Sequence, residues 1–500
     1  MRWLLLMKGF AKLLAVIVKL FLGIYHILRK GLHLPVMGLR RIMHKKREKK
    51  KHVVKHDEEE ARFIVKVFML CMLVLHKLYE VIRYKLYWWL YKRKINIYTK
   101  LSKNAYLDVF MIFVRDELKG EKNNLQFLQI ESVENYIKEK SQKASFQVVE
   151  KEKERYVCVP EYFEKSEERI EKFTSEKIYV AQMNDVEVIG ASDVVIADGK
   201  LLNDAVSQDE ENRLDIRYSA IKSVIKKVAL IEADGELLTF DEGIYLLGAA
   251  SYNYYHLVVE ILSRLAFVDY YEEYREYPIL IDEVVLRIPQ FATALGYFNK
   301  YNHKIIKIEK NQRCMVKKFV LPSHTVWMPI NLYNRNDIRV SDFLISETVL
   351  ENIRGMVTLY QEKEPWRKVF ISRKNTIAPR LRNEEKIREL FAENGFEIIY
   401  TEEFTFEQQV ECFGQAKCVV ASSGAALTNT IFCQPGTVIG CIIPSYHRFY
   451  MYSTIAYHLG LKPVFLDAEI IELTPYAASD IFELDEEYAY RYIKKVTNLL

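Results

Sequence analysis

The sequence predicts an α/β fold made of two Rossmann-like domains, preceded by an N-terminal, membrane-associated helical region. Strand-like and helix-like runs alternate twice along the chain, over residues 178–350 and again over 351–470. The first 100 residues are both strongly basic and rich in aliphatic side chains. A chain of 500 residues, of which 50% are hydrophobic, is long enough to bury the cores of two or three domains.

The net charge of +5 conceals a basic arm joined to an acidic body. Residues 1–100 hold 24 Lys and Arg against 6 Asp and Glu, a net charge of +18, so the remaining residues, with 48 and 61, carry −13. Leu, Ile, Val, Phe and Trp lie between the basic residues of the arm, which favours anionic lipid as its partner. An acidic body argues against a nucleic-acid reader.

Two segments of the arm, 4–30 and 61–94, predict membrane-associating helices. Lys8, Lys12, Lys19, His26 and Lys30 recur every four or seven positions and form a basic stripe. The apolar runs 13–18 and 20–25 are far shorter than the roughly 20 residues of a spanning helix. We therefore expect helices that lie in the interface of an anionic membrane surface over residues 1–95, with a true span as the alternative.

The seven cysteines show neither a disulfide framework nor a zinc site, because no Cys-x-x-Cys pair occurs and their number is odd. No metal is expected on this basis. The absence of Asn-x-Ser/Thr sequons and of a cysteine framework points weakly to a reducing compartment.

Residues 101–177 are charged, helix-prone and poor in Gly and Pro, with repeated Glu and Lys over 137–154 and 163–177. This composition predicts a helical stalk or linker between the arm and the globular body.

A globular pattern begins near Ile178 and predicts an α/β domain over 178–350. Short β-rich runs are separated by Asn184-Asp185, Gly190 and Asp198-Gly199. The expected strands lie at 178–181, 186–189, 194–197, 229–231, 244–248, 278–282, 304–308 and 319–322.

The second alternation, over 351–470, predicts a Rossmann-like domain of parallel βαβ units. The expected strands are 368–372, 396–400, 418–421, 437–443 and 463–466, and the expected helices are 384–394, 405–416, 425–432 and 450–459. Within the last segment, 471–500, a C-terminal helix at 488–500 is expected to pack across the other domain.

His256, Glu260 and Arg264 are each four residues apart in an otherwise apolar helix. They would stack on one helical face, and burying all three costs several kcal/mol unless they are paired or face a polar cleft. Such a helix is typical of an active-site wall. The alternative is an ordinary Glu260–Arg264 ion pair at the surface.

Two strand ends of the second domain carry groups suited to an anion. After the strand 418–421, Ser423 can cap a helix and Gly424 allows close approach, so the helix start can hold a diphosphate. After the strand 368–372 come Arg373 and Arg380, which can neutralise phosphate. Both signals fall on the same edge of one predicted sheet, although packing residues and solvated arginines give similar patterns.

Taken in order, these motifs resemble glycosyltransferase family 61, inverting enzymes with a two-domain, GT-B-like architecture. The resemblance spans about 178–466 and rests on Tyr255-His256 with Glu260 and Arg264, on Ile371-Ser-Arg373, and on the loop 423–429. It also includes Arg380, Asn383-Glu384, Gly395-Phe396, Phe406, Gln409, Phe432 and Pro435-Gly436. The chain departs from the family loop at Ser423, where a His is usual, and at Ala426, where a Gly is usual.

The resemblance implies transfer of a sugar from a nucleotide-sugar to a glycan or lipid-linked acceptor, with inversion. His256 or Glu260 would be the base, with Arg264 holding their ionisation, and no metal or cofactor is required. The donor would be held by Arg373, Arg380, Asn383, Gln409, Ser423, Gly424, Ala425, Leu427, Thr428 and Asn429. The domain 178–350 would then face the acceptor.

With the basic arm, the same resemblance implies a place at the cytoplasmic face of the cell membrane. There the enzyme would act in bacterial capsule, exopolysaccharide or cell-wall glycan synthesis, as a homo-oligomer or within a synthesis complex. Two alternatives stay open: a polysaccharide pyruvyl transferase, and a catalytically weakened scaffold or glycan-binding subunit, which the changes at Ser423 and Ala426 allow.

Overall fold

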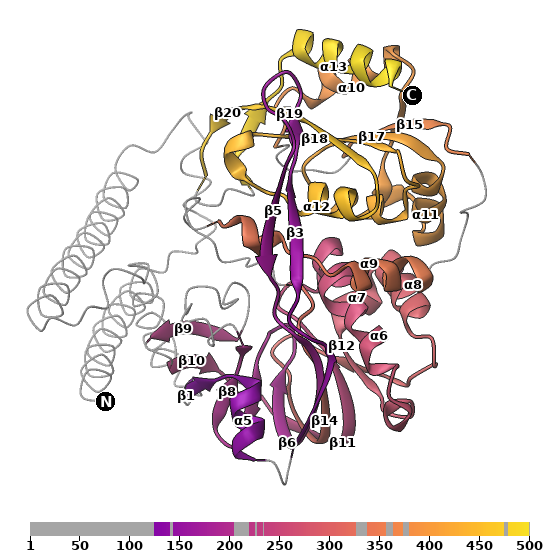
Figure 1. Ribbon diagram of the computed structural model, residues 1–500. Helices are drawn as coiled ribbons and strands as arrows, with labels where there is room; N and C mark the ends of the chain where they lie inside the picture. Colours follow the sequence, from indigo (N-terminus) through magenta and orange to yellow (C-terminus); the bar gives the residue numbers. More distant parts are fainter. Residues whose placement is uncertain are drawn as a thin grey trace, which may run out of the picture. The chain divides into compact units, whose positions relative to one another are not determined.

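The computed structural model describes residues 125–140, 144–204, 220–225, 228–233, 235–326, 338–356, 364–373, 380–474 and 479–499. Residues 1–100, with their predicted membrane-associating helices, and the first part of the predicted stalk lie outside this set. Asn124–Leu500 form one compact unit with two large β-sheets (Figure 1). None of the helices in the described part is both long enough and apolar enough to cross a membrane.

The first sheet is mixed and has the strand order β13-β12-β11-β14-β6-β7-β8-β1-β10-β9, with β2 also paired to β6. Its parallel part is β13, β12, β11 and β14, and β6 joins β14 in the antiparallel sense. The α/β prediction is confirmed, but the prediction of a Rossmann-like domain is wrong for this sheet, because β6 and its neighbours pair in the antiparallel sense and make the sheet mixed rather than all-parallel. Its strands are β1 (Leu125–Glu131), β2 (Ala144–Glu150), β6 (Ile178–Ile189), β7 (Val195–Ala197), β8 (Lys200–Leu202), β9 (Ile221–Ile225), β10 (Val228–Glu232), β11 (Leu237–Leu246), β12 (Ile279–Asp282), β13 (Ile305–Ile308) and β14 (Arg313–Pro322).

The second sheet has six strands in the order β16-β15-β17-β18-β19-β4, all paired in parallel as the strand–helix alternation predicts. Apolar side chains of α10 and α13 pack on one face, and those of α11 and α12 pack on the other. The strands are β4 (Glu161–Tyr162), β15 (Arg367–Ile371), β16 (Glu397–Ile399), β17 (Ala416–Ser422), β18 (Val438–Ile443) and β19 (Lys462–Asp467). The helices are α10 (Glu384–Glu393), α11 (Phe406–Gly414), α12 (Met451–His458) and α13 (Glu486–Asn498).

Further helices pack beside the parallel part of the first sheet and between the two sheets (Figure 1). They are α6 (Leu265–Val268), α7 (Glu283–Arg287), α8 (Pro289–Phe298) and α9 (Glu347–Met356), while α5 (Val133–Glu139) lies near β2. A small ribbon of β20 (Glu469–Glu472) and β21 (Ile481–Glu483) precedes α13.

The helical stalk is wrong for the described part of 101–177, which forms strands β1 to β5 and a single helix, α5. The charges that suggest a helix instead face solvent on an antiparallel ribbon of β3 (Glu154–Val159) and β5 (Arg169–Thr174). Lys172 Nζ, for example, lies 2.5 Å from Glu154 Oε1 across the two strands. Cross-strand ion pairs and helical ones use the same residue types, so composition alone does not separate them.

The ribbon also links the two sheets. The Cys158 amide donates to Thr454 Oγ1 at 3.2 Å, and His458 Nε2 lies 3.1 Å from the Tyr156 carbonyl, both of them contacts to α12. The segment predicted as a spacer is therefore part of the folded core.

Two smaller expectations are also corrected. β6 runs without interruption through the expected break at Asn184-Asp185, because it pairs with β14 in the same register on both sides of this point, although Asp185 itself has a left-handed φ of 56°. α13 packs on the second sheet rather than across the other domain, since Tyr492 Oη donates to the Val464 carbonyl at 3.0 Å and Tyr488 Oη to the Phe163 carbonyl at 2.7 Å.

Candidate active site

A helical segment that follows β11 in the chain carries the three ionisable residues that the sequence singles out. It winds as a π-helix, η4 (His256–Ile261), then as a 3₁₀ turn, η5 (Leu262–Arg264), and ends in α6. His256 Nδ1 lies 2.6 Å from Glu260 Oε2, so the imidazole and the carboxylate form a hydrogen-bonded pair. The Glu260–Arg264 surface ion pair is therefore wrong as an account of this helix.

Arg264 is fully buried, and its guanidinium hydrogen-bonds main-chain carbonyls. Nη2 donates to Leu247 O at 3.2 Å and Nε donates to Ile261 O at 3.4 Å. In a π-helix each hydrogen bond spans five residues, rather than the four of an α-helix. A residue four positions further along therefore projects in a different direction from the one it would take on an α-helix. Burial lowers the pKa of Arg264, and the negative charges of Asp193 and Glu260 oppose that change.

Asp193 and His324, which have no sequence signal, line the same small cavity of about 20 Å³ as His256, Glu260 and Arg264. Burial raises the pKa of Asp193 to about 6, and the charge of Arg264 opposes the rise. Burial lowers the pKa of His324 well below its usual value, and Arg264 lowers it further, so this imidazole is neutral at pH 7. The cavity thus combines a neutral imidazole, a His–Glu pair and a buried cation.

Asp282, the last residue of β12, holds two loops beside this cavity through hydrogen bonds. Its Oδ1 accepts from the Ala191 amide at 2.6 Å and its Oδ2 accepts from the Gly248 amide at 3.0 Å, so it holds the two loops that carry Asp193 and the start of the helical segment. Burial raises the pKa of Asp282 to about 6. A carboxylate at the carboxyl end of a predicted parallel strand is a signal that sequence reading could have used.

Arg373, Arg380 and Gly424, which are predicted to hold an anion, come together at the carboxyl ends of the neighbouring parallel strands β15 and β17. Arg373 Nη2 donates to the Ser423 carbonyl at 3.3 Å. A Cβ on Gly424 would lie 1.8 Å from Arg373 Nη2 and 3.5 Å from Arg380 Nη2, so the two guanidinium groups converge on this glycine. Burial lowers the pKa of Arg380 to about 10, and the like charge of Arg373 contributes to the shift. Two neighbouring cations in a largely buried place favour a multiply charged anion.

Two residues outside the predicted set complete this end of the site. Cys441 lies within hydrogen-bonding reach of the Ser423 side chain, and burial raises the pKa of its thiol to about 12. Tyr452 of α12 is buried close to both guanidinium groups, whose charges oppose the rise that burial causes in its pKa. Ser423 itself makes no capping bond, because the cap of the 3₁₀ helix η10 (Ala425–Phe432) is Gly424.

Gln409 and Asn429, predicted to hold the donor, are tied into a buried hydrogen-bond chain instead. Tyr254 Oη donates to Asn429 Oδ1 at 2.7 Å, and Asn429 Nδ2 donates to Gln409 Oε1 at 2.7 Å. Gln409 Nε2 in turn donates to the Thr401 carbonyl at 3.1 Å. This chain fixes η10 against the residues just before His256, so it positions the two ends of the site relative to each other.

Four other residues predicted to hold the donor lie in different surroundings. Asn383 lies at a different contact, where Nδ2 donates to the Leu484 carbonyl at 2.7 Å and fixes the segment before α13. Leu427 is part of the apolar core, Thr428 is buried, and Ala425 is partly exposed at the start of η10.

An aromatic contact joins the two ends. The Tyr255 ring meets the His256 ring edge-on with centroids 5.5 Å apart, and it meets the Tyr452 ring edge-on at 6.2 Å. Tyr452 in turn lies close enough to Arg373 and Arg380 to feel both charges, so aromatic contacts run from the imidazole towards the guanidinium pair.

Replacing Gly424 with Ala tests whether the close approach of Arg373 matters. The added methyl would displace the flexible end of Arg373, while the extended backbone of Gly424 accommodates Ala, so the free energy of unfolding should change by less than about 1 kcal/mol. Anion binding, measured by calorimetry with inorganic pyrophosphate, should weaken by roughly tenfold or more. Gly296→Ala is the control, since nothing lies within 4 Å of a Cβ there. Unchanged pyrophosphate affinity in Gly424→Ala would count against this anion site.

No three His, Cys, Asp or Glu side chains of the described residues gather in a way that could hold a metal ion.

Comparison with known proteins agrees with the sequence motifs. Residues 254–440 match the model of the family Glycosyltransferase 61. No curated protein matches the chain. The matched stretch contains His256, Glu260 and Arg264 together with Arg373, Arg380 and Gly424, whereas Asp193 and Tyr452 lie outside it. The resemblance to glycosyltransferase family 61 is thus confirmed over residues 254–440, and it supports a glycosyltransferase.

Proposed function

We propose that this protein is a membrane-associated, inverting glycosyltransferase that moves a sugar from a nucleotide-sugar donor to a hydroxyl of a glycan or lipid-linked acceptor. The observation that carries the proposal is the convergence of Arg373 and Arg380 on Gly424 at the edge of a parallel sheet, within the family-matched stretch. A nucleoside diphosphate is the leaving group that such a pair of guanidinium groups suits.

In this proposal the guanidinium pair stabilises the charge that develops on the departing diphosphate. As the bond between the sugar anomeric carbon and the diphosphate oxygen breaks, the electron pair stays on that oxygen, and Arg373 and Arg380 neutralise it. The acceptor oxygen forms the new bond from the opposite face, which inverts the anomeric centre. Two arginines and the first amides of η10 can do this without a metal ion.

The acceptor proton is assigned to His256. Because Nδ1 faces Glu260 Oε2 at 2.6 Å, the carboxylate favours the tautomer with hydrogen on Nδ1 and leaves Nε2 to accept the proton. Glu260 then orients the ring and stabilises the imidazolium, the arrangement used by other His–carboxylate pairs. Arg264, Asp193 and Asp282 support the pair from the core.

The basic arm supports a location at the cytoplasmic face of the cell membrane. Its net charge of +18 over residues 1–100 suits an anionic surface, and a lipid-linked acceptor would be presented there. Synthesis of a cell-surface polysaccharide, by a homo-oligomer or a larger synthesis complex, is the pathway class that fits these features.

A thermal-shift series on the full-length protein with nucleoside diphosphates and nucleotide-sugars tests the donor site. One nucleotide should raise the melting temperature by a few degrees, and Arg373→Ala should weaken its binding roughly tenfold to a hundredfold, the usual effect of losing a charged hydrogen bond.

Arg367→Ala is the matched control, because Arg367 begins the same strand and forms its ion pair with Glu397 at the surface, 2.7 Å away. If no nucleotide raises the melting temperature of the folded protein, the proposed donor site is wrong. The pyruvyl-transferase and scaffold alternatives then become the better accounts.

A further inference from the structure

A second, larger cavity lies beside the one that holds His256 and Glu260. It has a volume of about 390 Å³, within the range of roughly 300–1,000 Å³ typical of small-molecule sites. His324 and Val326 line both cavities, so the two are neighbours across these side chains. Most of its wall comes from residues before 254, such as Arg155, Ser175, Lys177 and Tyr179, and therefore lies outside the family-matched stretch.

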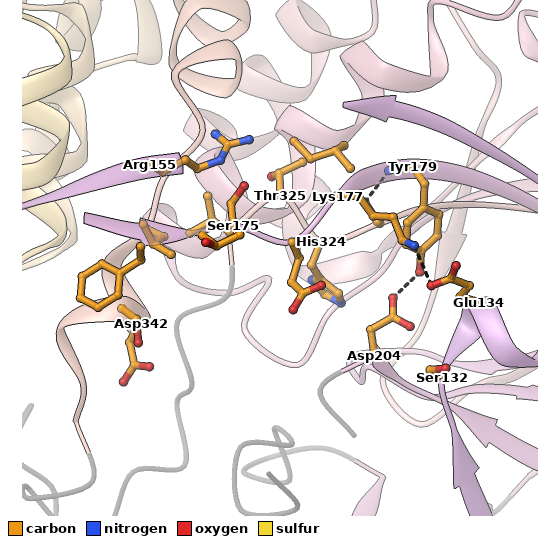
Figure 2. A pocket seen from close by; sticks show the side chains of 18 of the residues that line it. Ser132, Glu134, Arg155, Ser175, Lys177, Tyr179, Asp204, His324, Thr325 and Asp342 are labelled. Carbon is orange, nitrogen blue, oxygen red and sulfur yellow. Dashed lines mark hydrogen bonds and ion pairs between the residues drawn. The ribbon is translucent and has the colours of Figure 1, made fainter. Parts of the chain in front are cut away.

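Several charged groups around this cavity have a polar partner, as Figure 2 shows for two of the contacts. Lys177 Nζ donates to Glu134 Oε2 at 2.6 Å, and Tyr179 Oη donates to the Asp204 carboxylate. Arg155 Nη2 lies 3.1 Å from Glu150 Oε1. The lining holds three Lys or Arg and four Asp or Glu, so the opposite charges nearly balance and neither sign is concentrated enough to favour a phosphate or a metal ion.

Three polar atoms of the lining residues nevertheless lack a hydrogen-bond partner among the described residues: Arg155 Nη1, Ser175 Oγ and Thr325 Oγ1. Folded proteins rarely leave buried donors and hydroxyl groups unsatisfied, because each costs free energy that a ligand or an ordered water can recover. Figure 2 shows Arg155, Ser175 and Thr325 on one side of His324, with Lys177, Tyr179 and Asp204 on the other.

We propose that this cavity binds a neutral, hydroxyl-rich sugar residue of the acceptor glycan, next to the residue whose hydroxyl reacts at His256. A sugar presents hydroxyl groups that donate and accept, which suits the unsatisfied groups of Arg155, Ser175 and Thr325: these atoms are buried at the edge of the cavity, and small side-chain rotations bring them to a ligand there. An aromatic side chain, Phe173, adds apolar surface for a sugar face. This assignment of the acceptor site rests on the proposed transferase function, although sugar binding itself can be tested apart from transfer.

The test is saturation-transfer NMR on the full-length protein in a sugar-free detergent, with lactose, cellobiose and maltose as probes. The double variant Ser175→Ala/Thr325→Val removes two unsatisfied hydroxyls with little change in shape. At least one disaccharide should bind the natural protein and bind the double variant about tenfold more weakly, as expected for two lost neutral hydrogen bonds. Thr239→Val, on an exposed part of β11, should keep the signal.

The melting temperature of the double variant should stay unchanged or rise, because neither hydroxyl has a hydrogen-bond partner among the residues that the structure describes. That sign separates a ligand site from a structural role, in which the same changes would destabilise the fold. Disaccharide signals that persist in the double variant, or no signal from any disaccharide with the natural protein, would overturn the proposal. So would displacement of the disaccharide by inorganic pyrophosphate with Arg373→Ala in place, since the cavity would then be an anion site.

The outcome is distinct from that of the donor experiment. Nucleotide binding without disaccharide binding would leave the transferase proposal standing and remove this acceptor site. Disaccharide binding here without any nucleotide binding would keep the sugar site and favour the glycan-binding alternative over transfer.

Discussion

Replacing His256 with Ala is expected to lower kcat for sugar transfer by about a hundredfold to ten-thousandfold, the usual contribution of a positioned general base. In the proposed mechanism, Nε2 of His256 accepts the proton of the acceptor hydroxyl. The proposed donor site is at Arg373 and Arg380, so the nucleotide-induced thermal shift should be retained. Rates of nucleoside diphosphate release, measured with saturating donor and acceptor, check the first part, and the thermal-shift series checks the second.

A parallel variant, Glu260→Gln, separates the two bases that the sequence leaves open. The amide that replaces the carboxylate still meets the imidazole but cannot stabilise its charged form, so a smaller loss of kcat than in His256→Ala is expected. If His256→Ala keeps transfer within a few fold while Glu260→Gln abolishes it, the carboxylate is the base and the assignment to His256 is wrong. If both variants keep full function, catalysis at this pair is excluded.

Replacing Arg264 with Met is expected to destabilise the protein by about 3 kcal/mol, a typical cost of removing one charge from a buried set of opposite charges. Arg264 is fully buried, donates to the carbonyls of Leu247 and Ile261, and is the cation that opposes the raised pKa of Asp193. The free energy of unfolding, from urea denaturation at pH 7, measures the effect. Arg275→Met is the control, because Arg275 makes an exposed ion pair with Glu272.

The cause is identified by a double-mutant cycle with Asp193→Asn. If an uncompensated Asp193 carboxylate accounts for much of the loss, Asp193→Asn should cost far less in the Arg264→Met background than in the natural protein. Strict additivity would show that lost packing and carbonyl contacts, rather than charge, explain the effect.

The pH dependence of the free energy of unfolding is an independent test of the buried groups around Arg264. Asp193 and Asp282 each have a pKa of about 6 in the folded protein, above the value of about 3.9 for an unfolded Asp. Between these values the unfolded chain releases protons that the folded protein keeps, so their contribution makes the free energy of unfolding fall as pH rises from about 4 to about 6, and then level off. In Arg264→Met, Asp193 loses the charge that lowers its pKa, so its contribution to the free energy of unfolding should keep falling to higher pH. In Asp193→Asn this contribution should be absent.

Much of the second sheet could be predicted from the sequence because its signals are local. Each strand from β15 to β19 is a short apolar run beside a helix with clear end signals, such as the positive-φ Gly395 after α10 and Gly460 after α12. The meeting of Arg373 with Gly424 could also be expected, because neighbouring parallel strands end at the same edge.

The first sheet was harder to predict for the opposite reason. Strands β1 and β2 pair with β10 and β6, which are distant in the chain. In the separate ribbon of β3 and β5, the Glu and Lys residues match a helix as well as a strand pair. The hydrogen-bond partners of Gln409, Asn429 and Asn383 could not be predicted either, because they depend on which polar groups the tertiary packing places next to these side chains.

What the sequence determined by itself is the order of strands and helices in the second sheet, the three ionisable residues of one apolar helix, and the arginines at a strand end. All of these follow from patterns a few residues long. Only the tertiary structure decided that Arg264 is buried beside the His256–Glu260 pair, that Asp193, His324 and Tyr452 join the candidate site, and that residues before 178 contribute to the second cavity. Those outcomes depend on contacts between residues far apart in the chain, and neither composition nor spacing specifies them.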